Sequence, residues 1–411
     1  MYKRTTYACF IGIFMQALIT NVTAILFVPL RELYGLDFVQ LGILVLVNFS
    51  AQVLADVILT RIIDRTPFKR IVLAAAVMTT VGLTLFACTP WLMPGHFFAG
   101  ALAATVIFSF ASGMCEVVLS PIVDNMPDEG KGKATAMSLM HSFYAWGQVA
   151  TILLTTLALF VFGRANWQYI VFFWLIVPVL CFAFFVKAPI PEGVPAEKRE
   201  SVRRVLFSPY YLVALLAICF GAGTEVVMNQ WISTFAEAGL GMNKLVGDIL
   251  GMALFAVWMG VGRLCYGLFG KNINIRGVTM YGALLALGCY VLAALAPVPW
   301  ISLTFASLSG LFTSLLWPGT LVIATDKFPT SGAWLFAVLG IAGDVGAAAA
   351  PYITGLVTDL TAGAGTAMSL RYGLLASAIF PVLAFLCFRY LKRHASAERQ
   401  TKQIFFTYCK K

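Results

Sequence analysis

The sequence predicts an all-α integral membrane protein with twelve transmembrane helices in two pseudo-repeated six-helix bundles. Of the 411 residues, 60% are hydrophobic and only 11% are charged, which leaves too little polar surface for a soluble domain of this length. The charged residues are unevenly spaced, and the apolar runs between them reach about 20 residues, the length that a helix needs to cross a bilayer. In lipid, such a run satisfies its backbone polar groups internally only as a helix.

Breaks between the apolar runs divide the chain into twelve expected helices. The first six are expected at 5–30, 38–60, 70–93, 97–121, 134–163 and 166–186. Six more are expected at 209–235, 245–269, 276–296, 300–325, 331–358 and 370–391. The stretch between the two sets of helices carries charged residues among prolines, a composition that is typical of a solvated linker. We therefore expect an N-terminal bundle at 1–186, a cytoplasmic linker at 187–208, a C-terminal bundle at 209–393 and a basic cytoplasmic tail at 394–411.

Short patterns recur in the same order in the two halves, which indicates an internal duplication. Pro178-Val-Leu-Cys-Phe near the end of the sixth helix returns as Pro381-Val-Leu-Ala-Phe near the end of the twelfth. A four-residue spacing of polar or small residues begins at Asp56 in the second helix and at Arg263 in the eighth. Transporters commonly arise from repeated helix bundles that move against each other.

The net charge of +10 does not indicate nucleic-acid binding, because the basic residues form no basic face with aromatic platforms. These residues fall at the ends of apolar segments, where they indicate how the chain is oriented in the membrane. Basic residues favour the cytoplasmic side of a membrane. With both termini cytoplasmic, nearly all Lys and Arg residues lie inside, and the exceptions are Arg31, Arg164, Lys244 and Arg371. We expect a multi-pass protein of the plasma membrane, the inner membrane of a bacterium.

The turn between the second and third helices carries a recognisable pattern of charges. Residues 60–73 read Thr-Arg-Ile-Ile-Asp-Arg-Thr-Pro-Phe-Lys-Arg-Ile-Val-Leu and resemble the signature of the major facilitator superfamily, with Asp64, Arg65 and Arg70 in place and Thr60 where the family has glycine. The resemblance implies that the acid, Asp64, meets the positive N-terminal end of the eleventh helix and so latches the cytoplasmic side closed. We expect Arg65 and Arg70 at the same gate. The alternative is a solvated basic turn that only sets topology.

A narrower resemblance, to the fucose-permease-like sugar symporters of that superfamily, covers nearly the whole chain. The segments that resemble this branch are 113–121, 138–147, 223–231, 310–318 and 340–355. The resemblance implies sugar uptake with a protonatable glutamate at Glu116. Asn21 falls about where fucose permeases have an aspartate, and asparagine carries no proton at ordinary pH. A relay of two acids is therefore in question, and the coupling ion is a proton or, alternatively, sodium.

Carboxylates inside apolar helices are the first candidates for function, because a charge at membrane depth is costly unless it is paired or hydrated. We expect Glu116, Glu225 and Asp344 to take part in ion coupling, since desolvation favours a neutral carboxyl that can take up a proton. The alternatives are a neutral Glu116 that ties helices together, a Glu225 paired with a neighbouring helix, and an Asp344 paired with Arg263. Asp56 lies nearer the cytoplasmic end of its helix, and we expect Asp56 and Arg263 at a gate.

Neutral polar and aromatic residues within the apolar helices suit a sugar, which presents hydroxyl groups and an apolar C–H face. His141, Tyr144 and Gln148 share one face of the fifth helix, and Asn229 shares a face of the seventh with Glu225. A lone histidine is often only a hydrogen-bonded structural group, and no second histidine nearby suggests a metal site. The expected substrate contacts are Gln16, Asn21, His141, Tyr144, Gln148, Asn229, Trp231 and Trp317.

The function that the sequence favours is secondary active transport of a small polar solute, a sugar, by proton-coupled symport with alternating access. No catalytic constellation, nucleotide loop, cofactor or metal motif is expected, and we expect a monomer in the lipid bilayer. The alternative within the same superfamily is an efflux antiporter, although the fifth helix lacks the Gly-Pro motif of such proteins. A non-transporting membrane sensor is a remote alternative, because the loops and the tail are short.

Overall fold

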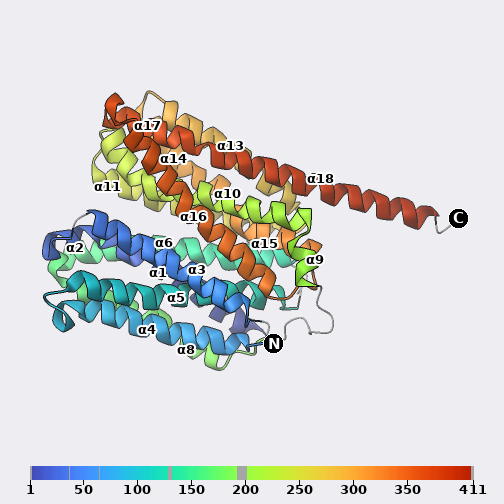
Figure 1. Ribbon diagram of the computed structural model, residues 1–411, viewed down its shortest axis with the longest axis horizontal. Helices are drawn as coiled ribbons and strands as arrows, with labels where there is room; N and C mark the ends of the chain where they lie inside the picture. Colours follow the sequence, from blue (N-terminus) through green and yellow to red (C-terminus); the bar gives the residue numbers. More distant parts are fainter. Residues whose placement is uncertain (1, 37, 64, 128–131, 192–200, 409–411) are drawn as a thin grey trace. The chain divides into compact units, whose positions relative to one another are not determined.

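The computed structural model describes residues 2–36, 38–63, 65–127, 132–191 and 201–408, and in these ranges the regular structure is helical throughout (Figure 1). Twelve helical segments in the described ranges are long and apolar enough to cross a membrane. They begin at Lys3, Ile43, Phe68, Phe97, Lys133, Arg164, Pro209, Gly247, Ile275, Pro299, Trp334 and Thr366. The predicted fold class is confirmed.

The chain forms two compact units, of which the first comprises residues 1–199 together with 332–344. Its helices are α1 (Lys3–Ile25), α2 (Phe27–Tyr34), α3 (Phe38–Thr60), α4 (Phe68–Leu92), α5 (Phe97–Asp124), α6 (Lys133–Phe162), the short η1 (Arg164–Asn166), α7 (Trp167–Trp174) and α8 (Ile176–Val186).

The second unit comprises residues 200–331 and 345–411. Its helices are α9 (Val202–Leu206), α10 (Pro209–Thr234), η3 (Phe235–Gly239), α11 (Lys244–Val246), η4 (Gly247–Ala253), α12 (Leu254–Phe269), η5 (Gly270–Asn272), α13 (Ile275–Leu295), α14 (Pro299–Thr313), α15 (Leu316–Lys327), η6 (Ala362–Ala364), α17 (Thr366–Ser377) and α18 (Ile379–Tyr408). The remaining helix, α16 (Trp334–Leu360), belongs to the first unit up to Asp344 and to the second from Val345. The predicted domain boundaries stay a prediction.

The two units repeat one pattern of helix pairing, as a duplicated chain requires. In the first unit α5 packs against α4 and α3, and α4 also packs against α8. In the second unit the corresponding helix α14 packs against α13 and α12, and α13 also packs against α18. The pairing therefore agrees with the recurring sequence patterns in the two halves.

Prolines explain where three of the membrane spans are interrupted. Proline has no N–H and its ring clashes with the carbonyl group four residues earlier, so a helix can kink or break just before it. Helices α4, α5 and α16 nevertheless continue through Pro90, Pro121 and Pro351. The interruption between α7 and α8 precedes Pro178, and the one between α17 and α18 precedes Pro381, its counterpart in the repeat. The third interruption, between α14 and α15, precedes Pro318 and leaves the carbonyl group of Ser314 without its helical partner.

Candidate functional site

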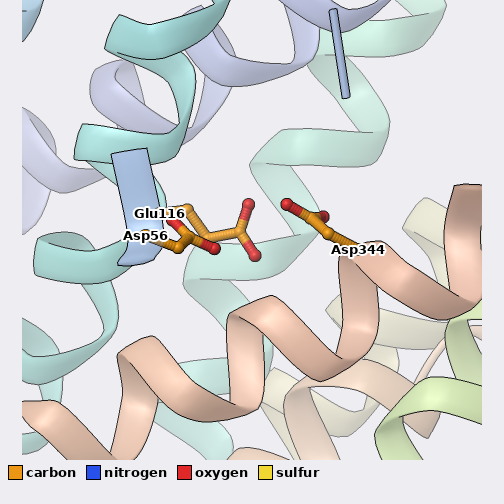
Figure 2. Close-up of side chains that lie close together, drawn as sticks. All are labelled: Asp56, Glu116 and Asp344. Carbon is orange, nitrogen blue, oxygen red and sulfur yellow. The ribbon is translucent and has the colours of Figure 1, made fainter. Parts of the chain in front are cut away.

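Three carboxyl groups from distant parts of the sequence meet inside the first unit. Asp56 comes from α3, Glu116 from α5 and Asp344 from α16, and one oxygen of each lies within 4.8 Å of one oxygen of each of the others. Figure 2 shows Asp344 pointing toward Asp56 and Glu116 from the opposite side. Asp56 is fully buried, Asp344 is nearly so, and Glu116 is partly exposed. We call these three residues the carboxylate cluster.

A close approach of two helices brings Asp56 beside Glu116. A Cβ atom added at Gly113 of α5 would lie 2.7 Å from the carbonyl oxygen of Gln52 on α3, so only glycine allows this packing. Asp56 follows Gln52 by one helical turn, and Glu116 follows Gly113 by nearly one turn, so each carboxylate lies on the face where the helices meet. The close backbone contact between α3 and α5 therefore positions the two acids.

A second glycine brings α16 to the cluster. A Cβ atom added at Gly340 would lie 3.1 Å from Oδ2 of Asp56 and 3.4 Å from Oε1 of Glu116. Asp344 lies four residues later on the same face of α16. The backbone of α16 thus covers the first two carboxylates, and its own acid completes the cluster.

Few hydrogen-bond donors reach these carboxylates. Gln16 of α1 donates from Nε2 to Oε2 of Glu116 across 2.6 Å. Both carboxylate oxygens of Asp56, Oε1 of Glu116 and Oδ2 of Asp344 are buried without a hydrogen-bond partner. Within the part of the chain that the structure describes, no Lys or Arg forms an ion pair with any of the three. Buried acceptors without donors are costly, so the cluster is suited to bind a cation or protons.

The second unit places its buried acid in a different environment. Arg263 of α12 donates from Nη2 to both carboxylate oxygens of Glu225 on α10, at 3.2 and 3.0 Å. The same guanidinium donates from Nε to the carbonyl oxygen of Ser314 across 2.7 Å. The Arg263 side chain is 3% exposed and that of Glu225 is 13% exposed. Glu225 thus pairs with a residue of a neighbouring helix, which is one of the alternatives stated from the sequence. Its role in coupling stays a prediction.

The expected substrate contacts of the first unit lie on α1 and α6, which pack against each other. A Cβ atom added at Gly147 would lie 3.0 Å from Cβ of Ala17, so this face of α6 touches α1. Asn21 donates from Nδ2 to the carbonyl oxygen of Ala17 across 2.7 Å. His141 is buried, with Nε2 lying 3.4 Å from Oγ of Ser120 on α5.

Gln16 and Gln148 are also buried, and Tyr144 is half-buried. Gln16 is the residue that the structure ties directly to the carboxylate cluster, through its bond to Glu116. The role of these side chains in binding a substrate stays a prediction.

The expected substrate contacts of the second unit lie on two helices, α10 and α15. Trp231 of α10 donates from Nε1 to the carbonyl oxygen of Pro351 across 3.2 Å, and its ring covers Gly355. Asn229 is half-buried on the same helix, and half-buried Trp317 lies in the first turn of α15, after the interruption. Their role in binding also stays a prediction.

The residues expected at a gate have different surroundings. Asp64 lies outside the described residues, and Arg65 and Arg70 are exposed near the turn between α3 and α4. Asp56 lies beside Glu116 and Arg263 pairs with Glu225. Neither Gly340 nor Ser314 was expected from the sequence to take part in a site, although Asp344 and Trp317, which lie near them, were named. The sequence held a signal for each of these two residues. Gly340 lies one helical turn before a buried acid, and the carbonyl group of Ser314 lies four residues before a proline.

Comparisons with known proteins agree with this architecture. The sequence profile of the Major Facilitator Superfamily matches residues 9–306. A Helicobacter pylori protein with the curated name "Putative glucose/galactose transporter" is 24% identical over 396 residues, which cover 90% of this chain and 93% of that protein.

Solved structures of sugar symporters have the same fold. The structure of FucP in the outward conformation matches with a TM-score of 0.77 at 14% identity, covering 94% of this chain and 98% of that one. A variant of FucP, the Escherichia coli fucose:proton symporter, matches with a TM-score of 0.75 at 15% identity, covering 95% of this chain and 99% of that one.

The proton:xylose symporter XylE, bound to 6-bromo-6-deoxy-D-glucose, matches with a TM-score of 0.75 at 11% identity and covers 93% of this chain and 94% of that one. At these identities the structural likeness shows the fold, whereas the sequence profile matches well over half of the chain. Together with the twelve membrane-spanning segments, the profile shows that this chain belongs to the Major Facilitator Superfamily of multi-pass membrane transporters.

Proposed function

We propose that this protein is a secondary active sugar transporter that couples uptake to protons by symport with alternating access. The observation that carries the proposal is the carboxylate cluster, three acids gathered in an apolar helix bundle and without a basic partner among the residues that the structure describes. Three negative charges within a few ångström repel one another strongly where the dielectric constant is low. Cation binding is therefore required for α16 to stay close to α3 and α5.

Glu116 is the best placed of the three to exchange protons. Its side chain is partly exposed, while Asp56 and Asp344 are buried. Gln16 holds Oε2 of Glu116 and leaves Oε1 for a proton. Proton uptake removes a charge from the cluster and loss of the proton restores it, so the protonation of Glu116 and the packing of α16 are linked by charge. We assign Glu116 and Asp344 to coupling on this basis.

A sugar is the proposed solute, on two kinds of support. The relatives in the comparisons are named as glucose/galactose, fucose and xylose transporters. Neutral amides, a phenol, an imidazole and tryptophans, the groups that bind hydroxyls and C–H faces, occur within the membrane spans. We propose that Gln16, Asn21, His141, Tyr144 and Gln148 bind from the first unit, and Asn229, Trp231 and Trp317 from the second.

The bias of basic residues toward one side of the membrane supports cytoplasmic termini and a place in the plasma membrane, the inner membrane of a bacterium. In that orientation an inward proton gradient drives uptake. We propose no cofactor, because none is needed for coupling through carboxyl groups.

Purified protein in proteoliposomes tests the proposal. Uptake of a panel of labelled hexoses and pentoses is followed with an inward proton gradient, with an inward sodium gradient at equal pH on both sides, and with neither. We expect at least one sugar to accumulate above its external concentration with the proton gradient, and collapse of the gradient by a protonophore to abolish accumulation. Export of a lipophilic cation, with no sugar moving under any gradient, would contradict the proposal and favour the efflux antiporter.

A further inference from the structure

Basic side chains gather where α13 begins and the last membrane span of the second unit ends. Lys392 and Arg393 follow Arg389 by three and four residues, so the three share one side of α18. Arg389 and Arg393 are exposed and Lys392 is half-buried. Among the described residues, the ion pair at this end joins Arg276 to Asp326 across 3.3 Å, and neither Arg389 nor Arg393 forms one. This side of α18 therefore carries positive charge that the described acids do not balance.

Lys392 reaches from α18 to the first turns of α13. Its Nζ atom lies 5.0 Å from the ring centroid of Tyr281 and 3.8 Å from the position that a Cβ atom at Gly277 would take. Gly277 and Tyr281 are one helical turn apart on α13, so they lie on one face. A cation is attracted to the face of an aromatic ring, and the glycine leaves room beside that ring for the ammonium group. We call Gly277, Tyr281, Arg389, Lys392 and Arg393 the basic patch.

An exposed apolar face continues from the basic patch along both helices. Tyr281 is 55% exposed, and the exposed Leu284 and Leu285 follow it by three and four residues on α13. On α18 the exposed Leu386 precedes Arg389 by three residues. Exposed apolar side chains of a membrane span face acyl chains, and tyrosine is favoured at the level of the headgroups. The two helices thus present basic groups, then a tyrosine, then leucines, which is the order of headgroup and acyl chain in a phospholipid.

The chemistry of the basic patch favours an anionic phospholipid over other phosphate compounds. Lysine and arginine form charge-assisted hydrogen bonds with phosphate oxygens. A soluble phosphate makes no contact with the exposed leucines of α13 and α18, whereas a phospholipid covers them with an acyl chain. A zwitterionic phospholipid brings a cation of its own, which the three basic residues repel. Basic sites between membrane helices on the cytoplasmic side bind anionic headgroups for these reasons.

We propose that the basic patch binds one anionic phospholipid, with its phosphate group on Arg389 and Lys392 and an acyl chain along Tyr281 and Leu284. Arg393 adds to the positive potential that attracts the headgroup. The lipid joins the outer surfaces of α13 and α18, which pack against each other in the second unit. The proposed topology places this end of the unit in the cytoplasmic leaflet. The site is independent of the proposed sugar and of the coupling ion.

Native mass spectrometry of the full-length protein measures the binding. The protein is titrated in detergent with dioleoylphosphatidylglycerol, which is anionic, or with dioleoylphosphatidylcholine, which has the same acyl chains and a zwitterionic headgroup. We expect the first molecule of the anionic lipid to bind more tightly, and inorganic phosphate in the same concentration range to give no adduct. Lys392→Ala should weaken this first binding step about fivefold, the contribution of one basic residue near an anionic membrane surface.

Two further variants separate the site from a general attraction of charge. Lys187→Ala is the matched control, because Lys187 is an exposed basic residue that follows α8, the counterpart of α18 in the first unit. It removes the same charge and should bind the lipid as the parent does. Gly277→Leu keeps every charge and fills the space beside Lys392, so it should weaken binding although leucine favours the helix. Both variants should elute as monodisperse protein with the melting temperature of the parent or higher.

Hydrogen–deuterium exchange in nanodiscs locates the lipid. Adding phosphatidylglycerol to phosphatidylcholine nanodiscs should slow exchange of the amides of residues 273–278, at the start of α13. The amides of residues 68–73, at the start of the corresponding helix α4, should be unchanged. Lys392→Ala should lose the protection at the start of α13.

Several outcomes would overturn the lipid site. Equal affinity of the parent for the two lipids would show that the patch does not select a negative charge. Equal losses in Lys187→Ala and Lys392→Ala would reduce the binding to a general attraction between basic residues and anionic lipid. Unchanged binding in both Lys392→Ala and Gly277→Leu would place the lipid elsewhere. Inorganic phosphate that binds as tightly as the lipid would assign the patch to a soluble anion.

Discussion

Nε of Arg263 donates to the carbonyl oxygen of Ser314 across 2.7 Å, and Ser314 is the residue whose carbonyl group loses its helical partner because of Pro318. One guanidinium therefore satisfies a backbone acceptor at the interruption between α14 and α15 and, with Nη2, the buried carboxylate of Glu225. Arginine can do both because its donors form a fixed planar fork. The break in the helix and the buried ion pair thus form one arrangement in the second unit.

Arg263→Ala should be among the most destabilising single substitutions in the second unit. It leaves a buried carboxylate without its partner, and removing one member of such a pair typically costs about 3–5 kcal/mol. We expect a clear fall in the melting temperature of detergent-solubilised protein. Arg263→Lys keeps the charge, but cannot reach Glu225 and Ser314 with the same fork, so its melting temperature should lie between those of Arg263→Ala and the parent.

Two further variants test whether the loss of the ion pair with Glu225 causes this fall in stability. Glu225→Gln alone removes the negative charge and leaves Arg263 buried, so it should also lower the melting temperature. The double variant Arg263→Met with Glu225→Gln removes both charges and should be less destabilised than the sum of Arg263→Met and Glu225→Gln made singly. Additive effects of the two substitutions would show that the pair does not act as a unit.

Pro318→Ala should make α14 and α15 more continuous. Alanine restores an N–H at residue 318, which can bond to the carbonyl group of Ser314 and compete with Arg263. The net change in stability should be small, about 1 kcal/mol or less, because one hydrogen bond replaces another. Hydrogen–deuterium exchange across residues 311–320 measures the effect, and we expect slower exchange there than in the parent. Unchanged exchange in that segment would mean that the interruption does not depend on the proline.

Glu116→Gln should abolish accumulation of the transported sugar while retaining its exchange. Glutamine preserves the size of the side chain and can accept the hydrogen bond of Gln16, but it cannot exchange a proton. Uptake into proteoliposomes should therefore stop at equal concentrations on the two sides, and counterflow into preloaded vesicles should continue. Glu237→Gln, which changes an exposed acid of the second unit, is the control and should accumulate sugar as the parent does. Accumulation by Glu116→Gln at the parent level would remove Glu116 from coupling.

The sequence predicts the membrane spans well because length and hydropathy are local properties that the bilayer imposes on each segment. It does not predict the interruptions before Pro178 and Pro381, because the sixth and twelfth helices are expected to be continuous, as α5 and α16 are across their own prolines. The duplicated pattern of these prolines then indicates that the two bundles share one pairing of helices, as the structure shows.

The arrangement of the charged residues could not be predicted in the same way. Asp56, Glu116 and Asp344 each read as a buried acid in its own helix, and nothing local indicates that three helices bring them together. Their meeting depends on the close approach of α3 and α5 at Gly113 and on the approach of α16 at Gly340. The partner of Glu225 was likewise open, because pairing of Arg263 depends on how α10 and α12 pack rather than on spacing along either helix.

Gly340→Ala should weaken coupled uptake more than it weakens the fold. The added methyl group would lie 3.1 Å from Oδ2 of Asp56 and 3.4 Å from Oε1 of Glu116, so α16 or the carboxyl groups must shift by a few tenths of an ångström. Such a shift disturbs the carboxylate cluster, while alanine in place of glycine itself favours a helix by about 0.5–1 kcal/mol. We expect a lower initial rate of proton-driven uptake, with a melting temperature close to that of the parent. Gly288→Ala in α13 makes the same exchange where no atom lies within 4 Å, and it should leave uptake unchanged. Equal uptake by both variants would show that contact between α16 and the cluster has no part in coupling.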